Sequence, residues 1–502
     1  MRSLLLPGFW GAIVAGCLLR FWTLTGVSLW YDELWTVVGS SDRPLVEMYR
    51  EWILGDDHPP AFFVANFLWF KLVPPTEFWA RVPHAVIATV TVIYVLAWTK
   101  RVLNRDERLM SAGLMALCSM NIHYALEVKQ YSAMILLATV ATACYLEIVQ
   151  SGRMGRRSGI LFTASCVGIA HLNYFATVYA GLLLLLLAAT FRDNRAVLRH
   201  VVRSGAVFGV CYLPVAYFLY LQLAYPGGTQ PPTNAAAFVS ELLAAVFFDD
   251  RAFLRGALFV FALALLTTVG LRPEVRAALG SRRNGHLLLI WIAMTGFMLA
   301  LGAWKPIFFP RYFFITFPAL LIGVGILAAA TFPPRASWLA VLPLVFLARG
   351  AVIEFRAVDG LQRQEWDKSV ALVLEHRRPS DRVFVLGAWA DKTSFDYLKD
   401  GNIDGLFYVK NLEFYEYYFK RKGAPEVAAN LEVLQPTVQS VMELAARFRG
   451  TGTTAYVLAG HHIEYSGEAW EALRQAATRV DVAVLYNALV YTVSFDARGA
   501  NE

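Results

Sequence analysis

Charged residues are scarce in this sequence, and the loops that bind nucleotides are missing. Only 17% of the 502 residues are Asp, Glu, Lys or Arg, whereas 57% are hydrophobic and the mean hydropathy is +0.48. A chain this apolar is not expected to be a soluble globular protein, so we predict a polytopic membrane protein. Glycine-rich phosphate loops of the Walker or dinucleotide type are absent, which argues against a nucleotide as the donor substrate.

Cysteine is also rare, and there are no runs of basic residues. The five cysteines all lie in apolar segments and lack the paired spacing of a metal site, so we interpret them as buried apolar residues. The formal net charge is +7, but no basic run alternates with aromatic residues, and nucleic acid is therefore not an expected partner. The arginines gather instead in loops between apolar segments, where membrane topology accounts for them.

Eleven apolar segments are long enough to cross a bilayer. They cover about 4–24, 82–98, 109–122, 131–150, 159–171, 174–191, 204–224, 255–271, 286–303, 312–331 and 336–350. The first segment has no small-residue cleavage site, so we expect a retained span rather than a signal peptide. AFFVANFLWF (61–70) is only ten residues long, which favours a helix on the membrane surface over a crossing.

The positive-inside rule supports this choice, because counting 61–70 as a span would change the side of every later loop. With 61–70 on the surface, the loops assigned to the cytoplasm hold sixteen Lys and Arg, whereas the later outer loops hold four. We therefore expect a multi-pass protein of the cytoplasmic (inner) membrane, with a transmembrane module at 1–350. The long first loop (25–81) and the tail (351–502) then share the outer, periplasmic side.

The tail differs in composition from the rest of the chain. Short runs typical of strands occur at 382–388, 405–409, 454–460 and 482–495, and helix-like stretches such as WDKSVALVLEHRR and VQSVMELAARF lie between them. This pattern predicts a small soluble α/β domain outside the membrane. Its aromatic stretch LEFYEYYFKRK (412–422) could help choose an acceptor or could dock on the membrane surface.

The first loop contains two adjacent carboxylates in an aromatic setting. Asp32 and Glu33 lie in SLWYDELWTVV, a composition typical of the membrane interface. Partial desolvation there would raise their pKa and make them better bases. Asp56 and Asp57 in the same loop are equally well explained as ordinary solvated loop charges.

Other ionisable and aromatic residues occur at the outer ends of later spans. They are Glu127, Lys129 and Tyr131 in 121–132, His171 in 171–175, and Arg311 and Tyr312 in 304–314. Such residues are also common as interfacial anchors, and that alternative stays open. Carboxylates and cations around an apolar bundle suit a lipid-linked phosphate: cations hold the phosphate, a carboxylate deprotonates an attacking hydroxyl, and the spans hold the lipid tail.

Several motifs together resemble a known family. WYDELW, GDDHPPAFFVANFLW, FWARVPHAVIATVTVIYVL, YALEVKQYSAMILL, AHLNYFATVYAGLLLLL and PRYFFITFPALLIG occur in the order typical of the bacterial dolichyl-phosphate-mannose protein mannosyltransferase-like family. That family belongs to the GT-C superfamily and is related to the aminoarabinose transferase of lipid A. The similarity covers roughly 1–330 and implies a GT-C fold of about eleven transmembrane helices.

The resemblance implies an integral membrane glycosyltransferase that takes a sugar from a polyprenyl-phosphate-linked donor and inverts the anomeric carbon. The family's acidic pair matches Asp32-Glu33, and its HPP element, which lies along the membrane surface, matches His58-Pro59-Pro60. Where the family commonly reads SQEARxY, this chain reads ALEVKQY, with Lys129 in place of arginine. Lysine supplies the charge but not the bidentate fork of arginine.

These observations lead to specific role predictions. We expect Asp32 to act as the general base, with Glu33 orienting or replacing it. Lys129, Arg311 and Arg81 are expected to stabilise the departing phosphate, and the remaining substrate-binding candidates are His58, Glu127, Tyr131, His171 and Tyr312. No metal and no cofactor are expected, because cations alone can hold a monophosphate. The expected partners are the lipid-linked donor, membrane lipid, and a glycan, lipid or protein acceptor.

Two other classes of function compete with this interpretation. A transporter or flippase of lipid-linked glycans would need ionisable residues near the bilayer midplane and interrupted helices in repeated halves, whereas here the charges stay at the span ends. A non-catalytic membrane scaffold would leave the acidic first loop without a role.

Overall fold

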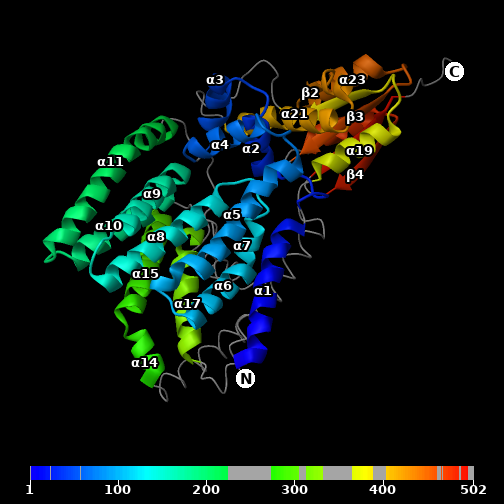
Figure 1. Cartoon of the computed structure of the whole chain (residues 1–502). Helices are drawn as coiled ribbons and strands as arrows, with labels where there is room; N and C mark the ends of the chain where they lie inside the picture. Colours follow the sequence, from blue (N-terminus) through cyan, green and yellow to red (C-terminus); the bar gives the residue numbers. More distant parts are fainter. Residues whose placement is uncertain are drawn as a thin grey trace.

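The structure is a computed structural model of the chain. It describes residues 2–22, 24–56, 58–223, 273–304, 313–331, 365–387, 403–460, 465, 467–485 and 488–495. A bundle of long helices forms one part of the molecule, and a sheet flanked by helices forms the other (Figure 1).

Nine of the expected spans fall on helices of the bundle. These are α1 (Arg2–Trp22), α5 (Glu77–Trp98), α6 (Arg105–Leu117) with α7 (Ser119–His123), α8 (Tyr131–Ser151), α9 (Arg156–Leu172), α10 (Tyr174–Thr190), α11 (Arg195–Leu223), α15 (Arg282–Trp304) and α17 (Phe317–Thr331). Short helices η2 (Thr99–Arg101), α14 (Pro273–Leu279) and η3 (Phe314–Thr316) adjoin them. In the described part of the chain, four helices are long and apolar enough to cross a membrane. The expected spans 255–271 and 336–350 lie outside the described residues, so the total of eleven stays a prediction.

Local signals explain where several of these helices begin and end. Thr76 precedes α5, and its hydroxyl oxygen accepts a hydrogen bond from the Trp79 amide. Asn104 and Glu107 form a reciprocal capping box at the start of α6. Helix α8 ends at Gly152, whose φ of +66° is the left-handed conformation that glycine adopts without steric cost.

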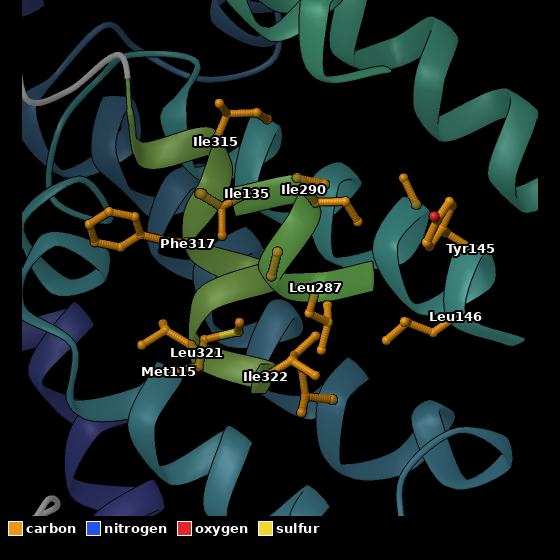
Figure 2. Close-up of a cluster of buried hydrophobic side chains, with 14 of the residues drawn as sticks. Met115, Ile135, Tyr145, Leu146, Leu287, Ile290, Ile315, Phe317, Leu321 and Ile322 are labelled. Carbon is orange, nitrogen blue, oxygen red and sulfur yellow. The ribbon is translucent and has the colours of Figure 1, made fainter. Parts of the chain in front are cut away.

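The bundle packs around one large apolar core. Figure 2 shows part of it, where side chains from α6, α8, α15 and α17 meet; labelled members are Met115, Ile135, Leu287, Ile290, Leu321 and Ile322. Helices α1 and α6 approach each other closely: a Cβ atom on Gly16 would lie 2.5 Å from the carbonyl oxygen of Ala116. The buried Arg20 side chain donates to that same oxygen at 2.7 Å, so the contact is polar as well as tight.

The first loop forms a layer of short helices. It contains α2 (Tyr31–Ser40), α3 (Leu45–Met48), η1 (Tyr49–Ile53) and α4 (Ala61–Phe70). The predicted ten-residue helix at 61–70 is therefore present, and at about 1.5 Å per residue it covers only half of a hydrocarbon core. Figure 1 shows α2, α3 and α4 at the end of the bundle away from the N-terminus and α14.

The tail contains the expected α/β unit. Its elements are α19 (Trp366–His376), β1 (Arg382–Leu386), α21 (Ile403–Arg421), α22 (Pro425–Ala428), β2 (Glu432–Leu434), α23 (Val438–Phe448), β3 (Thr454–Gly460), α24 (Gly467–Ala476), β4 (Arg479–Leu485) and β5 (Ala488–Ser494). The strand order is β2-β1-β3-β5-β4; β1 pairs in parallel with β2 and β3, and β5 pairs antiparallel with β3 and β4.

Alternating side chains give this sheet two buried faces. Val383 and Val385 of β1 belong to a core shared with α19 and α21, whereas Phe384 and Leu386 face a core formed with α23 and α24. This alternation is the period of two expected for a strand covered on both sides.

One strand prediction in the tail is wrong. Residues 405–409 lie within the helix α21, although aromatic and β-branched residues favour strands locally. The buried residues that follow recur with a helical period, namely Asn411, Phe414, Tyr415, Tyr418 and Phe419. That stripe makes a helix the arrangement that buries the most apolar surface.

Helix α21 packs on the first loop. Phe414 of α21 makes edge-on contacts with Tyr31 of α2 and Trp366 of α19, at ring-centroid distances of 5.2 and 5.6 Å. One apolar cluster therefore contains residues of the first loop and of the tail. The predicted domain boundary at 350 and 351 lies outside the described residues.

Candidate functional site

Glu33 and Arg81 form a buried ion pair between α2 and α5. Glu33 is 0% exposed and Arg81 is 1% exposed. The Arg81 Nε and Nη2 atoms donate to the two carboxylate oxygens at 3.0 and 2.7 Å. Nη1 and Nη2 also donate to the carbonyl oxygens of Val27 and Ser28. All three guanidinium nitrogens thus bind protein oxygens, so this geometry does not favour Arg81 as a phosphate ligand. For Glu33 it favours the predicted orienting role over the alternative of replacing Asp32 as the base.

The same carboxylate joins α2 to the segment before α8. Glu33 accepts from the Trp30 amide at 3.2 Å, which closes the first turn of α2, and from the Val128 amide at 3.1 Å. Asp32 precedes Glu33, and Lys129 follows Val128, so this one contact brings the predicted base and a predicted phosphate ligand into the same region. Asp32 is partly exposed in the first turn of α2.

Asp56 lies between two of the predicted substrate-binding residues. Its carboxylate is 2.6 Å from Nδ1 of His58 and 3.6 Å from Nζ of Lys129, and all three residues are buried. Burial by itself would raise the pKa of Asp56, but the charges of Lys129 and His58 and the hydrogen bonds from His58 lower it to about 2. Asp56 is thus an anion that holds a lysine and a histidine side by side.

Helix α11 fixes the backbone around this cluster. The side-chain nitrogen of Gln222 lies within hydrogen-bond distance of the carbonyl oxygens of Ile53, Asp56 and His58, at 2.8, 2.7 and 3.1 Å. The Tyr174 hydroxyl donates to the Gln222 side-chain oxygen. The loop that contains the Asp56 cluster is therefore tied to two helices of the bundle.

The other described candidates occupy different environments. Glu127 is buried, and its carboxylate is 2.9 Å from Nε2 of His123. Tyr131 is 1% exposed and packs in the bundle core, with its ring 4.5 Å from that of Tyr124. Glu127 thus pairs with a neighbouring histidine, and Tyr131 contributes to the core of the bundle.

His171 lies away from the cluster. Its Nε2 atom is 3.0 Å from the carbonyl oxygen of Cys211 on α11. Cys211 is eleven residues before Gln222, which is roughly 16 Å along a helix. The structure therefore gives His171 a contact between α9 and α11 and does not bring it to the cluster.

The tail supplies contacts to the start of α2 that the sequence did not suggest. The Tyr418 hydroxyl of α21 accepts from the Leu29 amide at 2.7 Å and lies 2.9 Å from the Ser28 hydroxyl. Burial raises the pKa of Tyr418 well above its usual value, so the phenol stays neutral. Nearby, Nζ of Lys410 lies 3.7 Å from the centre of the Trp52 ring and 2.8 Å from the Glu413 carboxylate. These contacts hold the first loop against the tail.

Some candidate site residues lie outside the part of the chain that the structure describes. Asp57, Arg311 and Tyr312 lie outside the described residues. Within the described part of the chain, no three His, Cys, Asp or Glu side chains come together as a metal site requires. The expectation that the reaction needs no metal stays a prediction.

Three residues that shape the candidate site were not selected from the sequence. The sequence leaves Asp56 open between an ordinary loop charge and a site residue, although its position two residues before His58 is a usable signal. Gln222 carries no such signal. Tyr418 lies in the aromatic stretch 412–422, but its contact with the first loop could not be predicted, because the contacts of Gln222 and Tyr418 join residues 164 to 390 positions apart.

Part of the chain matches a known protein family. Residues 57–218 match the model of a family described as dolichyl-phosphate-mannose-protein mannosyltransferase. A comparison with curated protein sequences gave no match.

Among solved structures, ArnT from Cupriavidus metallidurans is similar in its undecaprenyl-phosphate-bound and apo forms. Each has a TM-score of 0.57 and 13% identity, and the match covers 98% of both chains. The archaeal oligosaccharyltransferase AglB from Archaeoglobus fulgidus, in complex with an inhibitory peptide and a dolichol-phosphate, matches with a TM-score of 0.40 and 12% identity. That match covers 90% of this chain and 69% of AglB.

Proposed function

We propose that this chain, a GT-C superfamily protein related in fold to ArnT, is an integral membrane glycosyltransferase. It transfers a sugar from a polyprenyl-phosphate donor to a hydroxyl group of a glycan, lipid or protein acceptor. The reaction takes place at the outer face of the cytoplasmic membrane and inverts the anomeric carbon. The charge distribution supports this orientation, because Arg153, Arg156 and Arg157 lie at the opposite end of α8 from Lys129.

One observation carries the proposal: the anionic Asp56 of the first loop lies next to His58 of the same loop and to Lys129 of the segment before α8. Lys129 and His58 share the carboxylate of Asp56, and the Glu33–Val128 hydrogen bond connects this cluster to the residue after Asp32. A phosphate monoester needs cations at its oxygens, and an attacking alcohol needs a base. The cluster and Asp32 supply these two requirements from one region of the protein.

The proposed reaction proceeds as a direct displacement. Asp32 takes the proton of the acceptor hydroxyl while its oxygen forms a bond to the anomeric carbon of the sugar. The bond from that carbon to the phosphate oxygen breaks, and the polyprenyl phosphate departs with the electron pair. Lys129 and His58 bind the phosphate, and Asp56 positions these two side chains.

The geometry favours one of the two roles expected for Glu33, orienting the base, and suggests a role for Arg81 other than phosphate binding. We assign Glu33 and Arg81 a positioning role, because each neutralises the charge of the other in a site closed to solvent. Their contacts fix the direction of the first turn of α2 and therefore the position of Asp32. Arg311 and Tyr312 remain predicted phosphate-binding and substrate-lining residues. Glu127, Tyr131 and His171 support the surrounding helices in this proposal.

The central experiment replaces the proposed base. Asp32→Asn should lower the release of polyprenyl phosphate from a radiolabelled polyprenyl-phosphate sugar by roughly 10²–10⁴-fold, the usual cost of losing a general base. The assay uses the purified full chain in phospholipid nanodiscs with a panel of donor sugars.

Asp42→Asn is a matched control. Asp42 is an exposed carboxylate of the same loop, and its φ of +45° is a conformation that asparagine tolerates well. This control should retain wild-type turnover. Near-wild-type turnover of Asp32→Asn would remove Asp32 from the mechanism, and absence of release by the wild-type protein with every donor would refute the proposed function.

A further inference from the structure

A second charged site lies at the other end of the bundle. The short helix η2, the end of α8 and the start of α9 line an open hollow of about 690 Å³. Four arginines, Arg101, Arg153, Arg156 and Arg157, and one carboxylate, Glu147, contribute to its lining; the other lining residues are Gln, Ser and Gly. Helix α8 separates this hollow from Lys129 by about 30 Å, the length of 21 helical residues. It is therefore distinct from the site described above.

Among the described residues, three of the four arginines of the hollow have no ion-pair partner, and the fourth has only a solvated one. Arg101 pairs with Glu147 at 3.1 Å, but their side chains are 59% and 27% exposed, and such solvated pairs contribute little stability. Arg153, Arg156 and Arg157 are exposed, and the described part of the chain offers them no carboxylate within ion-pair distance. Like charges gathered in this way repel each other unless an anion joins them.

The start of α9 adds to the positive potential. Gly155 is the residue before the helix and has no side chain to accept hydrogen bonds from the first turn. The first turn contains Arg156 and Arg157 and no acidic residue. Free backbone N–H groups and the helix dipole both favour an anion at this position, and guanidinium groups match the geometry of phosphate oxygens.

The surroundings of the hollow indicate that the anion belongs to a lipid. Trp98, at the end of α5, is 53% exposed, and Ile160, one turn into α9, is 58% exposed. Exposed tryptophan is typical of the membrane interface, and an exposed isoleucine near the start of α9 suits contact with an acyl chain. A lipid headgroup bound in the hollow would bring its acyl chains next to this apolar surface.

We propose that the hollow binds the phosphate headgroup of an anionic phospholipid, with the acyl chains lying along α5 and α9. The bound lipid stabilises this end of the bundle and is neither donor nor acceptor in the transfer reaction. Basic pockets between spans on the cytoplasmic side suit such headgroups.

Native mass spectrometry of the purified full chain tests the proposal. The protein is titrated in detergent with phosphatidylglycerol and, separately, with phosphatidylcholine of the same chain length. The wild-type protein should retain phosphatidylglycerol preferentially. The triple variant Arg153→Gln, Arg156→Gln and Arg157→Gln should bind it about 100-fold more weakly, at roughly fivefold for each arginine near the membrane surface.

Three arginines outside the hollow provide a matched control. Arg192, Arg195 and Arg199 are exposed near the start of α11, at the same end of the bundle, and their replacement by glutamine removes the same charge. This control should keep wild-type binding. Glu147→Gln should strengthen binding a few-fold, because it removes the one negative charge of the hollow.

Three results would overturn the proposal. These are unchanged binding by the triple variant, an equal loss in the control, or displacement of the lipid by millimolar inorganic phosphate, which would identify a free anion as the occupant. None of these readouts depends on transferase activity, so they are independent of the proposed function.

Discussion

Removing the Arg81 side chain should release the first loop from the bundle. In Arg81→Ala, the Glu33 carboxylate stays buried without a counter-charge, and the carbonyl oxygens of Val27 and Ser28 lose their donor. Breaking a buried ion pair by deleting one partner costs about 3–5 kcal/mol. Because about 1.4 kcal/mol corresponds to a factor of ten, local opening should become roughly 10²–10⁴-fold more frequent.

Hydrogen exchange of two backbone amides reports this opening directly. The Trp30 and Val128 amides both donate to Glu33, so peptides covering 28–36 and 124–130 should lose protection together. The double variant Glu33→Leu with Arg81→Met should lose less protection, because it leaves no buried charge unpaired.

A second ion pair serves as the control for this experiment. Arg283 donates to Glu107 at 2.6 Å near the start of α6, at the other end of the bundle. Arg283→Ala should leave the first-loop amides as protected as in the wild-type protein, since distant sites act independently. Wild-type protection in Arg81→Ala would refute the reasoning, because the pair would then not be what holds α2 in place.

Three further outcomes are expected. Tyr418→Phe leaves the buried Leu29 amide without an acceptor, so it should lower the free energy of unfolding by about 1–3 kcal/mol, measured as a lower thermal unfolding midpoint in detergent. Because its pKa is lowered, Asp56 contributes about 2 kcal/mol to the free energy of unfolding above pH 4, and this contribution is lost as the pH falls from about 4 to about 2. Asp56→Asn should therefore remove this pH dependence from the stability measured by acid unfolding. Gly16→Ala places a methyl group against the Ala116 carbonyl and should destabilise the protein by about 1–3 kcal/mol in the same thermal assay, whereas Gly11→Ala, which meets no atom within 4 Å, should not.

The family match over residues 57–218 and the similarity in fold to ArnT agree with the resemblance seen in the sequence, and the main features of the fold could be predicted from the sequence. Apolar runs predicted the helices of the bundle because burial in lipid depends on composition over about 20 residues and not on tertiary contacts. The length of 61–70 distinguished a short helix from a span for the same reason. The strand expected at 405–409 was wrong because the local residue preference favours a strand, whereas packing against the first loop favours the helix α21.

By itself, the sequence determined which chemical groups lie near the two ends of the bundle, since charged side chains stay at the ends of apolar segments. It could not decide which of the adjacent carboxylates, Asp32 or Glu33, is buried in an ion pair and which stays partly exposed. Adjacent residues of a helix point about 100° apart, and only the tertiary structure decided that Glu33 faces Arg81, 48 residues away, and the Val128 amide, 95 residues away. The same holds for Asp56, which binds Lys129 only because the first loop folds back on the segment before α8. Partners so distant in the chain are set by the packing of whole elements, and no local pattern of residues records them.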